Sequence, residues 1–162
     1  MFREMRRKKQ LLSEYENIAV LKRGTSGVLA VSGDDNYPYA VPLSYVYHEG
    51  KIFFHCAKTG HKLDAIARNH KASFCVIDQD AVVPEEHTTY FRSVIVFGKA
   101  RVLCDESEKR SALEILAARY SPGHEQGCLQ EIEKQFSHVC LIELSVEHIS
   151  GKEAIELLKA KL

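Results

Sequence analysis

The sequence predicts a mainly β fold with helices (α+β), in which antiparallel strands form a small barrel. Segments rich in Val, Tyr, Phe and Ile follow one another, and short turn signals such as "SGDDN" and "HEGK" separate them. The long strand "TTYFRSVIVFGKARVLCD" is interrupted by Gly98, where a bulge or bend allows a strand to curve. Strands do not alternate regularly with long helices, so a barrel is favoured over a doubly wound parallel sheet.

The first part of the chain is predicted to contain a helical segment and several strands. Apolar residues recur at helical spacing over about 8–23, and Gly24 closes this segment. Residues 27–33 are predicted to form a strand. Residues 37–57 are predicted to form a further strand followed by a hairpin, because β-branched and aromatic residues dominate there and "HEGK" suits its turn.

The second part begins with a short helix that ends near Asn69, a strand over 71–78 and a polar loop before the long strand over 88–105. Asp105 and Glu108 resemble a capping box, and the apolar stripe that follows predicts a helix that "SPG" ends after Tyr120. The remaining predicted elements are a helix over 125–136, a strand over 138–152 and a C-terminal helix over about 152–160.

Length and composition favour one domain without a strong electrostatic field. The chain has 162 residues, 45% of them hydrophobic, which is enough for a single domain over 1–162. The 22 basic and 22 acidic residues balance, so neither nucleic acid nor a membrane surface is an expected partner. No stretch reaches the roughly 18 apolar residues of a membrane span. The five cysteines form no CxxC pair. We therefore expect a cytoplasmic protein with buried free thiols.

The stretch "FFHCAKTGHKLDAI", residues 53–66, places positive charge at the start of a predicted helix. A helix N-terminus is already partly positive, so acidic residues usually occupy its first turn. Here Asp64 is the one acidic residue, and the cations are Lys58, His61 and Lys62. Each misplaced cation costs on the order of 0.3–1 kcal/mol. The pattern therefore indicates an anion site, in which backbone N–H groups, a Thr hydroxyl, a lysine and an imidazole converge on a phosphate.

Other interpretations stay open at this point. The basic side chains can extend into water, and the chain contains neither a GxxxxGK[ST] loop nor a GxGxxG motif. In the preceding strand, "YAVPLSYVY", Pro42 cannot donate a ladder hydrogen bond. That strand therefore lies at a sheet edge, carries a bulge, or opens towards a ligand such as an aromatic ring.

Four segments carry a family resemblance over nearly the whole chain: "PYAVPLSYVYHEGKIFFHCAKTGHKLDAIARN", "YFRSVIVFGKARV", "RYSPGHE" and "ISGKEA". They resemble the nitroimidazole-resistance (Nim) proteins of the pyridoxamine-phosphate-oxidase-like, FMN-binding split-barrel superfamily. The resemblance implies a six-stranded antiparallel Greek-key split β-barrel. It also implies a homodimer that binds two FMN molecules in the clefts between its subunits.

The same resemblance implies the FMN contacts. His61 and Lys62 match the basic pair that holds the phosphate, with Thr59 as a hydroxyl donor. The segments that match the ring and ribityl contacts are Pro42, Leu43, Ser44 and Tyr45 on one strand, and His55, Cys56 and Ala57 on the next. Ser93 falls where the superfamily often places a Gln near the flavin, and its side chain is shorter.

His55 is the candidate catalytic residue, because the resembling Nim proteins often carry a histidine at this position. A histidine near the flavin can donate a proton, since its ordinary pKa lies close to neutral pH. The alternative is a histidine that packs at a strand end. A nucleophilic role for Cys56 is disfavoured, because adjacent strand residues point to opposite faces and Cys56 cannot pair with His55. Cys140, in "HVC", is likewise interpreted as a buried structural cysteine. The His and Cys spacings supply no third and fourth ligand, so no metal site is expected.

The leading hypothesis is a homodimeric FMN-dependent oxidoreductase that reduces a small electron-poor substrate, such as a nitroimidazole or another nitroaromatic compound. The alternative is a protein without turnover that carries flavin or haem, in which a histidine could serve as the axial ligand. A third possibility is an interaction module without a cofactor.

Overall fold

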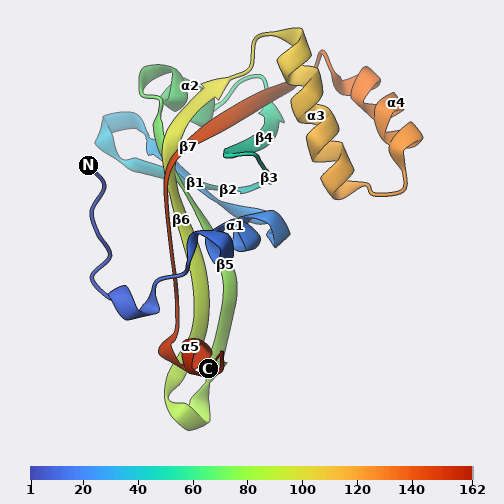
Figure 1. Cartoon of the computed structure of the whole chain (residues 1–162). Coiled ribbons are helices and arrows are strands. Elements are labelled where there is room, and N and C mark those ends of the chain that lie inside the picture. The colour runs from blue at the N-terminus through green and yellow to red at the C-terminus, as the bar shows by residue number, and fades with distance from the viewer. Residues whose placement is uncertain (162) are drawn as a thin grey trace.

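A seven-stranded antiparallel sheet, coiled around a hydrophobic core, forms the centre of the computed structural model, which describes residues 1–161 apart from the side chain of Glu125 (Figure 1). The strands are β1 (Ser26–Ser32), β2 (Pro38–Ser44), β3 (Val46–His48), β4 (Lys51–Ala57), β5 (Lys71–Val83), β6 (Thr88–Val102) and β7 (Val139–Glu153). The helices are α1 (Glu14–Arg23), α2 (His61–Arg68), α3 (Glu106–Tyr120), α4 (Glu125–Gln135) and α5 (Ile155–Lys159). None of the helices within residues 1–161 has the length and apolar character needed to cross a membrane.

The α+β class and the antiparallel pairing are as predicted, but a closed barrel of six strands is not what forms. The strand order is β2-β1-β5-β6-β7-β4-β3, so β2 and β3 are the two edges of an open sheet. A single residue, Tyr45, separates these edge strands in the chain. The chain thus crosses directly from one edge to the other, and β2 contacts β4 across the opening.

Pro42 lies on an edge strand, which was one of the three alternatives that the sequence left open. β2 pairs with β1, where Pro42 lies opposite Val28, and β1 is its one ladder partner within residues 1–161. The predicted hairpin is formed by β3 and β4. Its turn residues, Glu49 and Gly50, have φ angles of 45° and 77°, and this left-handed pair is typical of two-residue hairpin turns.

Two packed clusters use opposite faces of β4. Inside the coiled sheet, the Phe74 ring meets Tyr45 and Phe54 edge-on, with ring centroids 4.9 and 5.0 Å apart. On the outer face, α3 covers a second cluster, made of Val46, Phe53, Leu103, Ala112, Leu116 and Leu141. Side chains of a strand alternate between its faces, so His55, two residues after Phe53, points to the side of α3.

The prediction of a polar loop after residue 78 is wrong, because β5 continues to Val83 and pairs with β6 in a long hairpin that extends away from the rest of the sheet (Figure 1). The bend predicted at Gly98 is confirmed, since the register of β6 against β7 shifts between Phe97 and Gly98. A Cβ at Gly98 would lie 2.1 Å from the carbonyl oxygen of Ser145, so this approach of two strands requires glycine.

The termini also differ from the prediction. Residues 8–23 do not form one helix: a 3-10 turn covers Lys8–Gln10, and α1 starts after Ser13, which forms a capping box with Glu16. At the other end, β7 runs to Glu153, so the terminal helix starts at Ile155. One half of the capping box predicted for α3 forms: the Asp105 carboxylate accepts a hydrogen bond from the Glu108 N–H at 2.9 Å, whereas the Glu108 side chain binds Arg101.

Candidate functional site

The positive helix start predicted from the sequence is formed by α2, directly after β4. Its N-cap is Gly60, with φ 142°, and no side chain caps the helix. A Cβ added at Gly60 would meet no atom within 4 Å, so the space in front of the helix is open. The first N–H groups of a helix lack partners within it. An anion can therefore approach this helix end.

The two basic residues of the first turn are not equivalent. The His61 imidazole lies against the Tyr39 ring, with centroids 4.1 Å apart, and its Nε2 is 3.6 Å from a carboxylate oxygen of Asp34. Asp34 also forms an ion pair with Arg68 at 2.7 Å. Lys62 is half-buried and makes no ion pair with any side chain that the structure describes. Of these two residues, Lys62 is the one available to a ligand, whereas His61 is already engaged.

The side chains of the four residues predicted to contact the flavin ring from β2 and the crossover, 42–45, do not all face the same way. Pro42 and Ser44 are exposed, whereas Leu43 packs against the core. Tyr45 is fully buried, and its hydroxyl donates a hydrogen bond to the Leu21 carbonyl at 2.8 Å. The outward surface of this segment therefore consists of Pro42 and Ser44, and the Tyr45 side chain belongs to the core.

Exposed residues follow one another from the end of β4 to the start of α2. His55, Ala57 and Thr59 are exposed, and Cys56 is half-buried between the first two. Ser93 is not part of this group: it lies on the outward face of β6, opposite Ile77 and Lys152. The structure thus gathers the predicted residues from 55 to 62, places the edge strand β2 against β4, and leaves Ser93 on another face.

The thiols are less buried than the sequence predicted. Cys104 is exposed, and the other four cysteines are partly buried. Burial raises the pKa of Cys56 to about 11; the neighbouring Cys140 thiol adds to the rise, and Lys62 opposes it. Cys56 is therefore a protonated thiol near neutral pH, unlike the thiolate of a cysteine nucleophile. Among the side chains that the structure describes, no three His, Cys, Asp or Glu residues gather as a metal site would require.

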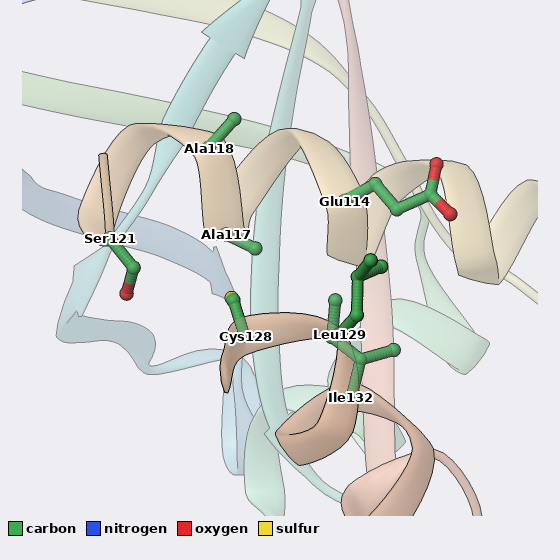
Figure 2. Close-up of a pocket in the computed structure, with 7 residues that line it drawn as sticks. All are labelled: Glu114, Ala117, Ala118, Ser121, Cys128, Leu129 and Ile132. Atoms are coloured by element: carbon green, nitrogen blue, oxygen red, sulfur yellow. The ribbon is translucent and has the colours of Figure 1, made fainter. Parts of the chain in front are cut away.

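His55 borders a cavity that the sequence did not predict. The cavity has a volume of about 490 Å³ and lies between the end of β4 and helices α3 and α4. Its apolar lining includes Leu113, Leu116, Ala117, Ile132 and Val139, and its polar lining includes His55, Glu131 and Gln135. An adjoining hollow of about 180 Å³ lies between the same helices, where Ala117 faces Cys128 and Ile132 (Figure 2). The sequence carried one signal of this packing: Cys128 and Ile132 are four residues apart, so they lie on the same face of a helix.

Tyr120 fixes the position of this cavity relative to the edge strands. Its hydroxyl accepts a hydrogen bond from the Tyr45 N–H at 3.0 Å and lies 2.6 Å from the carbonyl oxygens of Thr25 and Tyr45. Tyr120 also lines the cavity. The last turn of α3 is thereby tied to the crossover between β2 and β3, which places the cavity wall beside the surface that carries Ser44.

Comparison with known proteins shows what the chain is similar to. No curated protein matches it. A structure described as a 5-nitroimidazole antibiotic resistance protein under provisional assignment, from Bacteroides thetaiotaomicron, is 18% identical, with a TM-score of 0.73 over 88% of this chain and 86% of that one. An FAD-binding protein from Mesorhizobium loti is 24% identical, with a TM-score of 0.65 over 90% and 97% of the two chains. An FAD and heme binding protein from Mycobacterium smegmatis is 22% identical, with a TM-score of 0.73 over 94% and 80%.

These structural similarities establish the fold, and a sequence comparison establishes the family. Residues 13–153, which run from the cap of α1 to the last residue of β7, match the family described as "Pyridoxamine 5'-phosphate oxidase". The matched range includes α2, the edge strands and the cavity beside His55. The chain therefore belongs to the pyridoxamine 5'-phosphate oxidase family.

Proposed function

We propose that the protein is a homodimeric FMN-binding flavoprotein and an oxidoreductase that reduces a small electron-poor substrate, such as a nitroimidazole or another nitroaromatic compound. One observation carries the proposal: Lys62, which forms no ion pair with the described side chains, stands at the open start of α2, and His55, seven residues earlier in the chain, borders an apolar cavity. A basic, open helix start that the chain joins through residues 56–60 to His55, at the border of an apolar cavity, suits a molecule with a phosphate at one end and a ring at the other.

The residues at the start of α2 fit a phosphate group. Lys62 offers a charge, Thr59 an exposed hydroxyl and Gly60 an unobstructed approach. His61 would contribute less, because Asp34 and Tyr39 already hold its ring. Lys62 is therefore the proposed principal phosphate ligand, with His61 and Thr59 as supporting donors.

The ring side of the proposed site consists of exposed residues at two strand ends. Pro42 and Ser44 would lie along the isoalloxazine ring, and His55 and Ala57 would meet it from β4. In this proposal Leu43, Tyr45 and Cys56 act through the backbone and by packing, because their side chains turn towards the core.

A bound flavin would supply the transfer of two electrons, and the chain would supply the surroundings of the substrate. The apolar walls of the cavity would exclude water and accept a flat ring. The His55 imidazole, exposed at the edge of this cavity, would hold a proton and deliver it to the reduced substrate.

A second copy of the chain is the proposed partner, and an exposed apolar face supports this. Val28, Ile77, Ile95 and Phe97 remain 37%, 67%, 41% and 38% exposed on the outward side of β1, β5 and β6. Val28 and Ile95 lie opposite the same residue, Cys75, so this face is continuous across the three strands. Ser93 lies on it as well, and in the proposed dimer it would approach the flavin held between the subunits.

Haem is the second candidate cofactor, because His55 adjoins a cavity of about 490 Å³ with a largely apolar lining. His55 would then be the axial ligand. The absorbance spectrum of the purified protein distinguishes the proposals. A flavin band at about 450 nm that a reduced nicotinamide bleaches supports the oxidoreductase. A Soret band supports the haem protein, and flavin that no nicotinamide reduces supports a carrier without turnover.

A further inference from the structure

Cys56 and Cys140 lie directly opposite each other in the antiparallel ladder of β4 and β7. The preceding pair on the same face, Phe54 and Ile142, is fully buried, so the two thiols follow the core towards its end. Both are free and half-buried. They also interact, because the Cys140 thiol is one of the groups that raise the pKa of Cys56.

This arrangement matches what a disulfide needs. Residues directly opposite each other in an antiparallel pair have Cα atoms about 4.5–5.5 Å apart, and disulfides span Cα distances of about 4.4–6.8 Å. The pair can thus be bridged by side-chain rotation and a small adjustment of the backbone. Cys75 provides a contrast within the same sheet, since its partners in the ladders are Val28 and Ile95.

We propose that Cys56 and Cys140 are a redox modification site, at which a reversible disulfide joins β4 to β7. The oxidant is a low-molecular-weight disulfide such as oxidised glutathione. One protein thiolate attacks a glutathione sulfur, forms a mixed disulfide and releases one glutathione thiolate. The second protein thiolate attacks the protein sulfur of that mixed disulfide and releases the second glutathione. The protein loses two electrons and two protons, and oxidised glutathione becomes two molecules of glutathione.

The bond would have a structural effect next to the helix start. Lys62 is close enough to the Cys56 thiol to lower its pKa, in opposition to burial. A bridge at this point would fix the end of β4, from which the chain runs into residues 58–62. It would also close a loop from residue 56 to residue 140, and cross-links across long loops strongly restrict the unfolded chain. The proposal depends on the two thiols alone, and not on a bound flavin.

Peptide mapping of the intact wild-type protein tests the proposal. The protein is incubated with oxidised glutathione at about pH 8.5, because thiolate is scarce for a thiol of raised pKa near neutral pH. Remaining thiols are blocked before digestion with trypsin. Cleavage after Lys51, Lys58, Lys134 and Lys152 places Cys56 in peptide 52–58 and Cys140 in peptide 135–152. We expect these two peptides to be linked, and dithiothreitol to separate them.

Variants give a second readout. Cys56→Ser and Cys140→Ser should each abolish the cross-link, and the control Cys75→Ser should retain it. The oxidised wild type should melt roughly 5–10 °C above the reduced protein, a difference that both single variants lose. Mixed glutathione adducts on both cysteines without a bridge, or a bridge to any other cysteine, would overturn the proposal. The mapping on wild-type protein decides the matter even where a variant fails to fold.

Discussion

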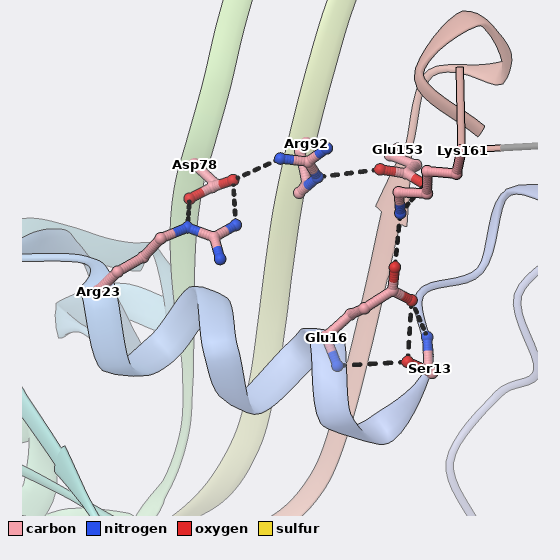
Figure 3. A network of polar contacts seen from close by, with 7 residues as sticks. All are labelled: Ser13, Glu16, Arg23, Asp78, Arg92, Glu153 and Lys161. Atoms are coloured by element: carbon pink, nitrogen blue, oxygen red, sulfur yellow. Dashed lines mark hydrogen bonds and ion pairs between the residues drawn. The ribbon is translucent and has the colours of Figure 1, made fainter. Parts of the chain in front are cut away.

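The Arg92 guanidinium binds the carboxylate of Glu153 at 2.9 Å, and only 1% of the Glu153 side chain is exposed (Figure 3). Arg92 also binds Asp78 at 3.1 Å, and Asp78 in turn accepts two hydrogen bonds from Arg23. Lys161 binds Glu153 from the other side. The network joins α1, both strands of the long β5–β6 hairpin and the end of β7.

Replacing Arg92 should therefore be costly. Arg92→Met leaves the buried Glu153 carboxylate with Lys161 alone, and removing one partner of a buried ion pair costs about 3–5 kcal/mol. The free energy of unfolding, measured by urea denaturation, should fall by this amount. Lys8→Ala, which removes an exposed ion pair to Glu4, should cost less than about 1 kcal/mol. Similar losses for the two variants would contradict this assignment.

The same network predicts a loss of stability in acid. Hydrogen bonds from Lys161 and from Ser13 lower the pKa of Glu16 from 4.5 to about 2. Burial tends to raise the pKa of Asp78, but hydrogen bonds from Arg23 and Arg92 outweigh it, so this pKa is lowered as well. A folded-state pKa below the unfolded value means stability that is present above the unfolded pKa and is lost as the pH falls.

The melting temperature should thus decrease from about pH 4.5 towards pH 2. Glu16→Gln should melt lower than the wild type at pH 6, and the difference should shrink as the pH approaches 2. A constant difference across this range would show that the Glu16 carboxylate contributes nothing through its ionisation.

Substitutions of two glycines, Gly98 and Gly127, distinguish the effect of close strand packing from that of helix propensity. Gly98→Ala places a Cβ 2.1 Å from the Ser145 carbonyl oxygen, so the strands must move apart and the unfolding free energy should drop by roughly 2–4 kcal/mol. Gly127→Ala, in α4, meets no atom within 4 Å and should stabilise the protein by up to about 1 kcal/mol. Denaturation curves of both variants test this, and an unchanged stability for Gly98→Ala would refute the close approach.

His55→Ala separates proton delivery from cofactor binding. If the imidazole delivers a proton, kcat for a nitroaromatic substrate should fall by about 10²–10⁴-fold, with a much smaller change in FMN affinity. His48→Ala, in the exposed β3–β4 hairpin, should change neither quantity. An unchanged kcat for His55→Ala would remove this residue from the proposed chemistry.

Local chemistry in the sequence accounts for much of the fold. The place of Pro42 at an edge, the bulge at Gly98 and the Asp105 cap each depend on a single residue and its nearest neighbours. The continuation of β5 past residue 78 could not be predicted in this way. Its polar residues are held by pairing with β6 and by the Arg92–Asp78 contact, which joins residues from different strands.

In the candidate site, too, features that depend on neighbouring residues could be predicted, and features that depend on distant contacts could not. The positive start of α2 was visible in one short segment, and His61 and Lys62 lie in the first turn of the helix, as the pattern predicts. The engagement of His61 by Asp34, and the burial of Tyr45 through its bond to Leu21, depend on residues more than twenty positions away. The cavity beside His55 likewise requires α3 and α4 to pack together, which no local pattern specifies.

The central claim is that Lys62 holds the phosphate of a bound flavin, and binding of FMN and riboflavin to the Lys62→Ala variant tests it most directly. Titration followed by fluorescence gives both dissociation constants, with Lys71→Ala on the exposed start of β5 as the control. We expect Lys62→Ala to weaken FMN binding by about 10–100-fold and riboflavin binding by less than about threefold, since only FMN carries the anion. Equal losses for the two flavins would contradict the claim.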